Sequence, residues 1–155
     1  MTSPPNGTPY TLPSTQAQGL ANYPHARTAP PTPHKTLYIS GTSSRRGDGT
    51  YDGITPHPTD GTLILDIRAQ TAAVLRNING IIKGATDGRG GLGNVIDATV
   101  FLVDLERDYE GLNEVWNRVW PERGDAPART TVEVRKLPGR GLLVEIKCTV
   151  VVCEE

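Results

Sequence analysis

Apolar and polar residues alternate along two segments near the C-terminus of the chain. In residues 142–152 every second side chain is apolar, a pattern formed by Leu142, Val144, Ile146, Cys148, Val150 and Val152. A period of two places these side chains on one face of a β-strand. Residues 126–134 form a second strand, and the Gly/Pro turn at 138–141 predicts a hairpin between the two. The alternation then places Arg129 and Glu145 on a shared sheet face, away from the core.

Apolar residues at three- and four-residue spacing predict two helices. The first begins near Asp60 and stops at Gly84, and the second is capped by Asp104 and ended by Pro121. The β-branched segment 95–103 between them predicts a strand.

Upstream of the helices, strands at 26–29 and 36–40 flank a proline-rich turn and predict a first hairpin. Residues 41–61 form a long polar loop with a short strand near 50–54. This order predicts an α+β domain, in which two helices pack on one face of a mixed β-sheet and the βαβ crossover is right-handed. The other face carries Leu143 and Val151 among charged residues, together with Thr99 and Phe101, which favours an oligomer contact.

Length and composition predict one domain at 23–155, preceded by a disordered tail at 1–22 that is rich in Pro, Thr, Ser and Gly. The formal net charge of −1 gives no reason to expect nucleic acid or an anionic membrane as a partner. Neither a membrane-spanning segment nor a secretory signal is evident. Cys148 and Cys153 are too far apart along one strand for an unstrained disulfide. We therefore expect a soluble cytoplasmic protein.

The sequence does not indicate a cofactor site. The three histidines, at positions 25, 34 and 57, lack ligand spacing, so no metal is expected. The glycine-rich segment 88–93 precedes a strand instead of opening a helix, which excludes a dinucleotide fingerprint.

Several motifs together resemble the Rid (YjgF/YER057c) family of enamine and imine deaminases. They are PARTTVEV at 127–134, Leu137-Pro138, VEI at 144–146, LYISG at 37–41, VFLVD at 100–104 and NEV at 113–115. The resemblance covers about residues 23–152. It implies a YjgF fold similar to that of chorismate mutase, a homotrimer with active sites between subunits, and hydrolysis without a cofactor.

The resemblance assigns roles to individual residues. Arg129 would grip the substrate carboxylate with its planar fork of N–H donors, and Glu145 would act as general acid and base. Ser40 and Gly41 stand at the family's early strand end, where the amide of Gly41 would be a second carboxylate donor. Without the resemblance, Arg129 and Glu145 would be ordinary polar residues on a solvated sheet face.

Two positions depart from the pattern common in the family. Many members have Gly-Pro-Tyr where this chain has Tyr23-Pro24-His25, so His25 stands in the place of a cleft tyrosine or is simply a loop histidine. Thr131 replaces a cysteine found two residues after the arginine in many members, which argues against thiol chemistry there.

YPHAR at 23–27 with SGTSSRR at 40–46 resembles a narrower branch, the 2-aminomuconate deaminases of tryptophan and aminophenol breakdown. Their substrate has a carboxylate at each end, so a second cation is needed, and Arg45 or Arg46 would supply it. The product would be 4-oxalocrotonate with ammonia.

The sequence is also compatible with two other functions. One is a general deaminase of small enamines and imines such as 2-aminoacrylate, in which Arg45 and Arg46 would be solvated. The other is a non-catalytic ligand-binding or chaperone-like trimer, or the ribonuclease and translation-inhibitor activity attributed to some relatives, although near-zero charge and few aromatics weaken the nucleic-acid version.

Overall fold

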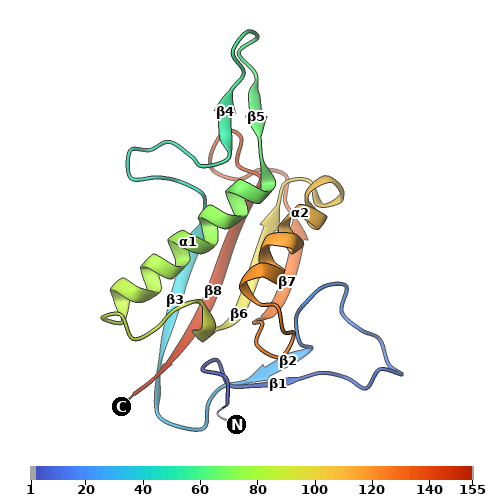
Figure 1. Ribbon diagram of the computed structural model, residues 1–155, viewed down its shortest axis with the longest axis vertical. Coiled ribbons are helices and arrows are strands. Elements are labelled where there is room, and N and C mark those ends of the chain that lie inside the picture. The colour runs from blue at the N-terminus through green and yellow to red at the C-terminus, as the bar shows by residue number, and fades with distance from the viewer. Residues whose placement is uncertain (1–2, 155) are drawn as a thin grey trace.

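The computed structural model describes residues 3–154 and consists of two helices on one face of a four-stranded sheet (Figure 1). The strands are β3 (His34–Thr42), β6 (Val95–Leu102), β7 (Ala128–Glu133) and β8 (Val144–Cys153), in the order β3-β8-β6-β7. β8 is antiparallel to both β3 and β6, whereas β6 and β7 are parallel. The predicted α+β fold with a mixed sheet is therefore confirmed.

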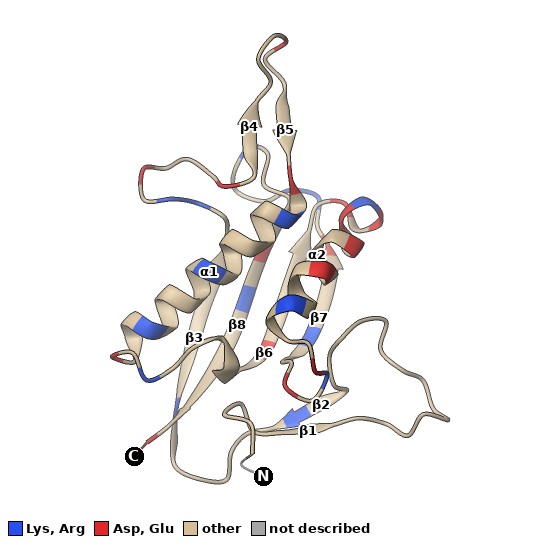
Figure 2. Cartoon of the chain, in the orientation of Figure 1, with Lys and Arg blue, Asp and Glu red and all other residues tan. Residues whose placement is uncertain are grey.

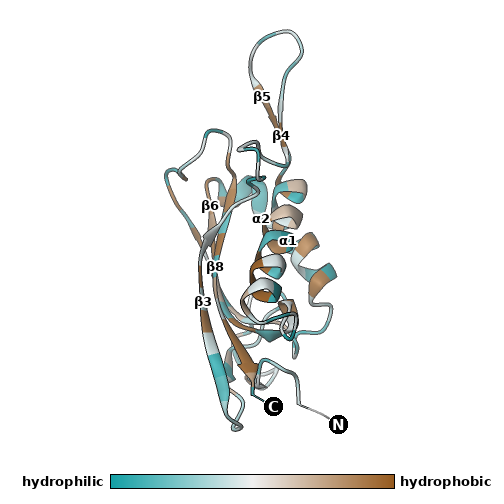
Figure 3. Ribbon diagram, turned by 90° about the vertical axis from the view of Figure 1, so that its left-hand side faces the viewer, coloured by the Kyte–Doolittle hydropathy of each residue, from teal (hydrophilic) through white to brown (hydrophobic). Residues whose placement is uncertain are grey.

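The helices α1 (Ile67–Ala85) and α2 (Leu105–Val119) lie side by side against this sheet (Figures 1 and 3). The predicted cap of α2 is confirmed, because the Asp104 carboxylate accepts a hydrogen bond from the amide of Arg107 at 2.9 Å. A short 3₁₀ turn, Leu92–Asn94, leads into β6. The covered face carries the core, where Trp116 of α2 and Val144 and Ile146 of β8 are completely buried.

The first helix starts later than the sequence predicts. Leu63–Leu65 form β5, which pairs with β4 (Ile54–Pro56) in a hairpin that projects from the body (Figure 1). Asp60 closes the turn of this hairpin by accepting from the amide of Thr62 at 2.9 Å. The residue that caps α1 is Asp66, which accepts from the amide of Ala69 at 3.0 Å.

Neither hairpin predicted for the main sheet forms. β7 and β8 lie on opposite sides of β6 and share no hydrogen bonds. β2 (Ala26–Thr28) pairs with β1 (Thr8–Tyr10), and β3 pairs with β8 instead. The pattern of apolar residues identified the strands but not their partners. Strands that are adjacent in sequence need not be neighbours in a sheet that contains a βαβ crossover.

Part of the segment that the sequence predicts to be a disordered tail contacts the domain through Asn6 and β1. Asn6 is completely buried, and its amide donates to the carbonyls of Val95 at 2.8 Å and Asp125 at 2.9 Å. Arg27 holds the same turn, donating to the side-chain oxygen of Asn6 at 2.6 Å and to the carbonyl of Gly7 at 2.7 Å. These contacts satisfy polar groups that would otherwise be buried without partners.

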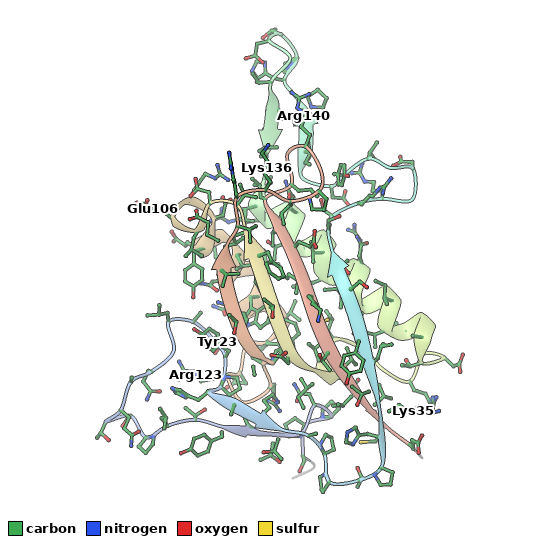
Figure 4. The ribbon with its side chains drawn as sticks, turned by 180° about the vertical axis from the view of Figure 1, so that it is seen from behind. Tyr23, Lys35, Glu106, Arg123, Lys136 and Arg140 are labelled. Atoms are coloured by element: carbon green, nitrogen blue, oxygen red, sulfur yellow. The ribbon has the colours of Figure 1, made fainter. Side chains whose placement is uncertain are left out.

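The second face of the sheet is not covered by a helix and is seen in Figure 4. It carries Tyr38, which is 74% exposed, and Val132, which is 36% exposed. The prediction for Leu143 is wrong, because this residue precedes β8 and is buried in the core. Among residues 3–154, no helix is long and apolar enough to cross a membrane.

Candidate active site

Arg129 and Glu145 lie on opposite faces of the sheet, contrary to the sequence-based expectation. Arg129 is in register with Ala98 of β6, which is 1% exposed on the helix-covered face. Glu145 is in register with Phe101 of β6, on the other face. Two strand spacings separate β7 from β8, about 10 Å, and the register offsets the two residues further along the strands. One small molecule therefore cannot contact both side chains of a single chain.

Three aromatic rings surround the guanidinium of Arg129. Its central carbon lies 4.8 Å from the ring centroid of Trp116, 4.9 Å from that of Tyr23 and 5.7 Å from that of Tyr109. Figure 4 labels Tyr23, which lies beside β7. We call these four residues the Arg129 pocket. Rings at these distances attract a cation through their electron-rich faces.

The side chain of Arg129 is largely shielded from solvent. Arg129 is only 8% exposed, and burial lowers the pKa of its guanidinium, whereas Tyr109 and Tyr23 act in the opposite direction. Tyr109 accepts a hydrogen bond from Nη2 at 3.3 Å. No partner within residues 3–154 accepts from the buried Nε or Nη1 atoms. A buried cation with unpaired donors is chemically suited to an anion.

Two further polar atoms near this pocket are buried without a hydrogen-bond partner in the described part of the chain. They are Oγ1 of Thr131, two residues beyond Arg129 on the same face of β7, and Oδ1 of Asn113. Asn113 lies between Tyr109 and Trp116 on one side of α2, since residues four and three apart share a helix face. These atoms add to the unpaired polar groups that α2 and β7 carry.

Glu145 lies against the backbone at the end of β3. A Cβ atom placed on Gly41 would come within 2.0 Å of the carboxylate of Glu145, so only glycine fits there without a shift. The pairing of β3 with β8 is interrupted between Ile39 and Thr42, which leaves Ser40 and Gly41 in a bulge, both exposed. Bulges of this kind re-aim the backbone beside functional groups. We call Ser40, Gly41 and Glu145 the Glu145 cradle.

The structure distinguishes the two adjacent arginines. Arg46 donates from Nε to the carboxylate of Asp52 at 2.9 Å, and Arg76 of α1 contacts the same carboxylate at 2.5 Å. The hydrogen bond from Arg46, followed by that from Arg76, holds the pKa of Asp52 below its ordinary value. Arg45 is exposed and has no acidic partner within residues 3–154. It lines an open groove with Gly41.

The loop that carries Arg45 is fixed to α1. The side-chain amide of Asn77 donates to the carbonyls of Ser43 at 2.9 Å and Arg45 at 3.1 Å. Figure 2 shows the basic segment of this loop beside α1. The backbone of Arg45 is therefore held in place while its cation stays available.

Both ring nitrogens of His25 contact the backbone of the segment between β1 and β2. Its Nδ1 atom accepts from the amide of Leu12 at 3.1 Å, and its Nε2 atom lies 2.9 Å from the carbonyl of Ala17. Both ring nitrogens are thus used to hold the segment between β1 and β2. Within this segment, Tyr23 is the residue that reaches Arg129.

Sequence reasoning missed the residues that surround Arg129. One available signal was Tyr23, which lies two residues before His25, the position where many family members have a tyrosine that enters the cleft. Tyr109 and Trp116 belong to the apolar stripe of α2 and look like ordinary core positions. Their contact with a cation depends on the register of β7, which the pattern did not reveal.

Comparison with known proteins decides the family. The sequence matches the family described as endoribonuclease L-PSP over residues 16–152, nearly the whole chain. The chain belongs to this family, the Rid (YjgF) family. It is 30% identical to the 2-iminobutanoate/2-iminopropanoate deaminase of Escherichia coli over 117 residues, which are 74% of this chain and 86% of that protein.

Other relatives support the same family. A RutC family protein from Pyrococcus abyssi is 38% identical over 82 residues, 53% of this chain and 59% of the relative. The chain spans only 59% to 62% of the length of the first curated relatives it matches. The structure of a Rid family protein of unknown function from Yersinia pestis superposes with a TM-score of 0.70 at 20% identity, covering 94% of this chain and 99% of that one. At that identity the likeness shows the fold.

Proposed function

We propose that the protein is an enamine/imine deaminase that acts on 2-aminomuconate and releases 4-oxalocrotonate and ammonia. The observation that carries this proposal is the Arg129 pocket. There a buried guanidinium has unpaired N–H donors and is surrounded by aromatic rings. A planar carboxylate is the ligand that such a fork accepts in two parallel hydrogen bonds. The similarity to an imine deaminase points to the same class of substrate.

The proposed reaction needs one proton carrier and one water. The enamine first becomes its imine tautomer, as carbon gains a proton and the amino nitrogen loses one. Water then adds to the C2 carbon, the C=N bond becomes a C–N single bond, and the amine leaves as ammonia when C=O forms. Glu145 takes the proton from water and returns it to the leaving nitrogen, as general acid–base catalysis requires.

A homotrimer would bring the two halves of this site together. β3 and β7 are the two edges of the sheet, and each carries one half, since the Glu145 cradle adjoins β3 and the Arg129 pocket adjoins β7. In a ring of identical chains, the β7 edge of one chain meets the β3 edge of the next. The opposite facing of Arg129 and Glu145 within one chain supports this arrangement.

The second carboxylate of the substrate would bind Arg45. Of the two adjacent arginines, Arg46 is committed to Asp52, whereas Arg45 lines the groove that begins at Gly41. A small monocarboxylate such as 2-aminoacrylate would not reach this group. Arg45 is thus the residue that favours a dicarboxylate over the general deaminase.

The substrate class is tested by measuring ammonia release in steady state with 2-aminomuconate and with 2-aminoacrylate. A higher kcat/KM for the dicarboxylate supports the proposal, and a higher value for 2-aminoacrylate supports the general deaminase instead. Absence of turnover with either substrate would favour a non-catalytic binding protein.

Mixing two variants of low activity tests the intersubunit site. Arg129→Lys and Glu145→Gln chains, unfolded together and refolded, should recover activity in mixed trimers, because some sites then take an intact Arg129 from one chain and an intact Glu145 from another. Random mixing should restore about a quarter of the sites, since the two chains of each site are drawn independently. If both residues had to come from the same chain, the mixture would stay as inactive as its components.

A further inference from the structure

The hydroxyl of Tyr109 makes the one hydrogen bond to the Arg129 guanidinium found in residues 3–154. Nη2 of Arg129 donates to this hydroxyl at 3.3 Å. A guanidinium has five N–H donors, so the contact leaves the others free for a ligand. The rings of Tyr23 and Trp116 attract the cation but accept no directed hydrogen bond from it.

Ring contacts alone leave the in-plane rotation of the guanidinium undetermined. A cation over an aromatic face gains nearly the same energy at many rotations about the axis normal to the ring, whereas a bidentate carboxylate needs one rotation. A hydrogen bond to one nitrogen selects that rotation. Tyr109 is therefore suited to set the direction in which the unpaired donors of Arg129 point.

Tyr109 stands on a well-fixed part of the molecule. It follows the cap of α2 at Asp104, and the same helix carries Trp116, whose indole N–H donates to the carbonyl of Asn22 at 3.0 Å. The phenol ring is half-buried, which limits its movement. A hydroxyl held in this way gives Arg129 a fixed reference before any ligand arrives.

We propose that Tyr109 is a positioning residue that orients the Arg129 guanidinium for a bidentate carboxylate. The inference rests on the proposed function only in naming a carboxylate as the ligand. It assigns to Tyr109 no contact with the substrate and no proton transfer, so its effect should be on binding and not on the chemical step.

The test compares Tyr109→Phe with Tyr10→Phe. Each substitution removes one hydroxyl and keeps the ring, but Tyr10 is an exposed residue of β1 outside the Arg129 pocket. No hydrogen bond within residues 3–154 involves the hydroxyl of Tyr10, which makes it the matched control. The probe is muconate, an unreactive dicarboxylate, with its Kd measured by titration calorimetry. We expect Tyr109→Phe to weaken muconate binding and to raise KM by roughly 10-fold with kcat changed little, and Tyr10→Phe to match the wild type.

Several outcomes would overturn the inference. They are an unchanged Kd and KM in Tyr109→Phe, equal losses in both variants, or a loss in kcat alone. Thermal unfolding of both variants shows whether the fold is retained, and Tyr109→His, which keeps a polar group on a ring, should recover part of the affinity if the hydrogen bond is the cause. If the wild type binds muconate but turns over no enamine, the proposed function fails while the Kd comparison still decides the role of Tyr109.

Discussion

The Arg129 pocket and the Glu145 cradle differ most in their contact with water. Arg129 is 8% exposed beneath α2 and the N-terminal segment, whereas Ser40 and Gly41 are exposed at a bulge of an edge strand. One half of the proposed site is thus a buried cation, and the other is a carboxylate beside solvent. This division suits the proposed hydrolysis, because the grip on a carboxylate strengthens where water is absent and the attacking water must still enter.

Despite this difference, both halves form within a single chain. The Arg129 pocket is assembled within one chain by β7, α2 and the segment that carries Tyr23. The Glu145 cradle is likewise preformed, since Gly41 already lies against Glu145. In the proposed trimer, association would add the second half to each and would remodel neither.

Removal of the proton carrier should give the largest effect. Glu145→Gln keeps the shape of the cradle but cannot move a proton, so kcat should fall by roughly 10²-fold or more while muconate binding persists. The same change at Glu110, an exposed position on α2, is the control and should leave kcat unchanged. A Glu145→Gln enzyme with a normal kcat would show that another group carries the proton.

Replacing the buried cation should have the next largest effect. Arg129→Lys retains the charge but loses the planar fork, and we expect a loss of about 2 kcal/mol in kcat/KM. Arg135→Lys, at an exposed position just beyond β7, should change nothing. Comparable activity in the two variants would make Arg129 a structural residue held by its aromatic neighbours.

The sequence predicted the helices and most strands, because periodicity and capping are local properties, whereas the charged residues that it assigned to a site stay a prediction. It failed at β7, where the alternation predicts that Arg129 faces away from the core. In the structure Val132 faces the open side, and Arg129 and Thr131 face α2. The usual rule that apolar residues lie beneath a helix does not hold at this edge, since the rings of Tyr109 and Trp116 accept a cation there.

The sequence also could not decide between Arg45 and Arg46. Their difference depends on Asp52 and Arg76, which come close only after the loop folds against α1. The pairing of the strands could not be predicted either, because β8 pairs with β3 and β6, which are both distant from it in the sequence. Long-range contacts of this kind leave no trace in local periodicity.

Substrate choice should respond to Arg45 alone. Arg45→Ala should lose about 1.5–3 kcal/mol, or roughly 10- to 150-fold, in kcat/KM with 2-aminomuconate and leave 2-aminoacrylate unchanged. Arg46→Ala is the control, since it removes one of the two arginine partners of Asp52 and should affect both substrates alike. Equal losses on both substrates in the Arg45→Ala variant would remove the support for a dicarboxylate.

The smallest effect should come from the anchor of the N-terminal segment. Of the two halves of the proposed site, this segment contacts the Arg129 pocket. Asn6→Ala removes hydrogen bonds to the carbonyls of Val95 and Asp125 and leaves Arg27 without one partner, so the free energy of unfolding should fall by about 1–3 kcal/mol. The control is Asn117→Ala at an exposed position on α2, and both are measured by denaturant unfolding.

Because Tyr23 belongs to the same segment, loosening it should also raise KM for carboxylate substrates several-fold, while kcat, which depends on the Glu145 cradle, should stay close to that of the wild type. A fall in kcat with KM unchanged would mean that the segment supports the Glu145 side instead. No change in either stability or KM would show that Tyr23 reaches Arg129 without help from the anchor at Asn6, and that the pocket depends only on β7 and α2.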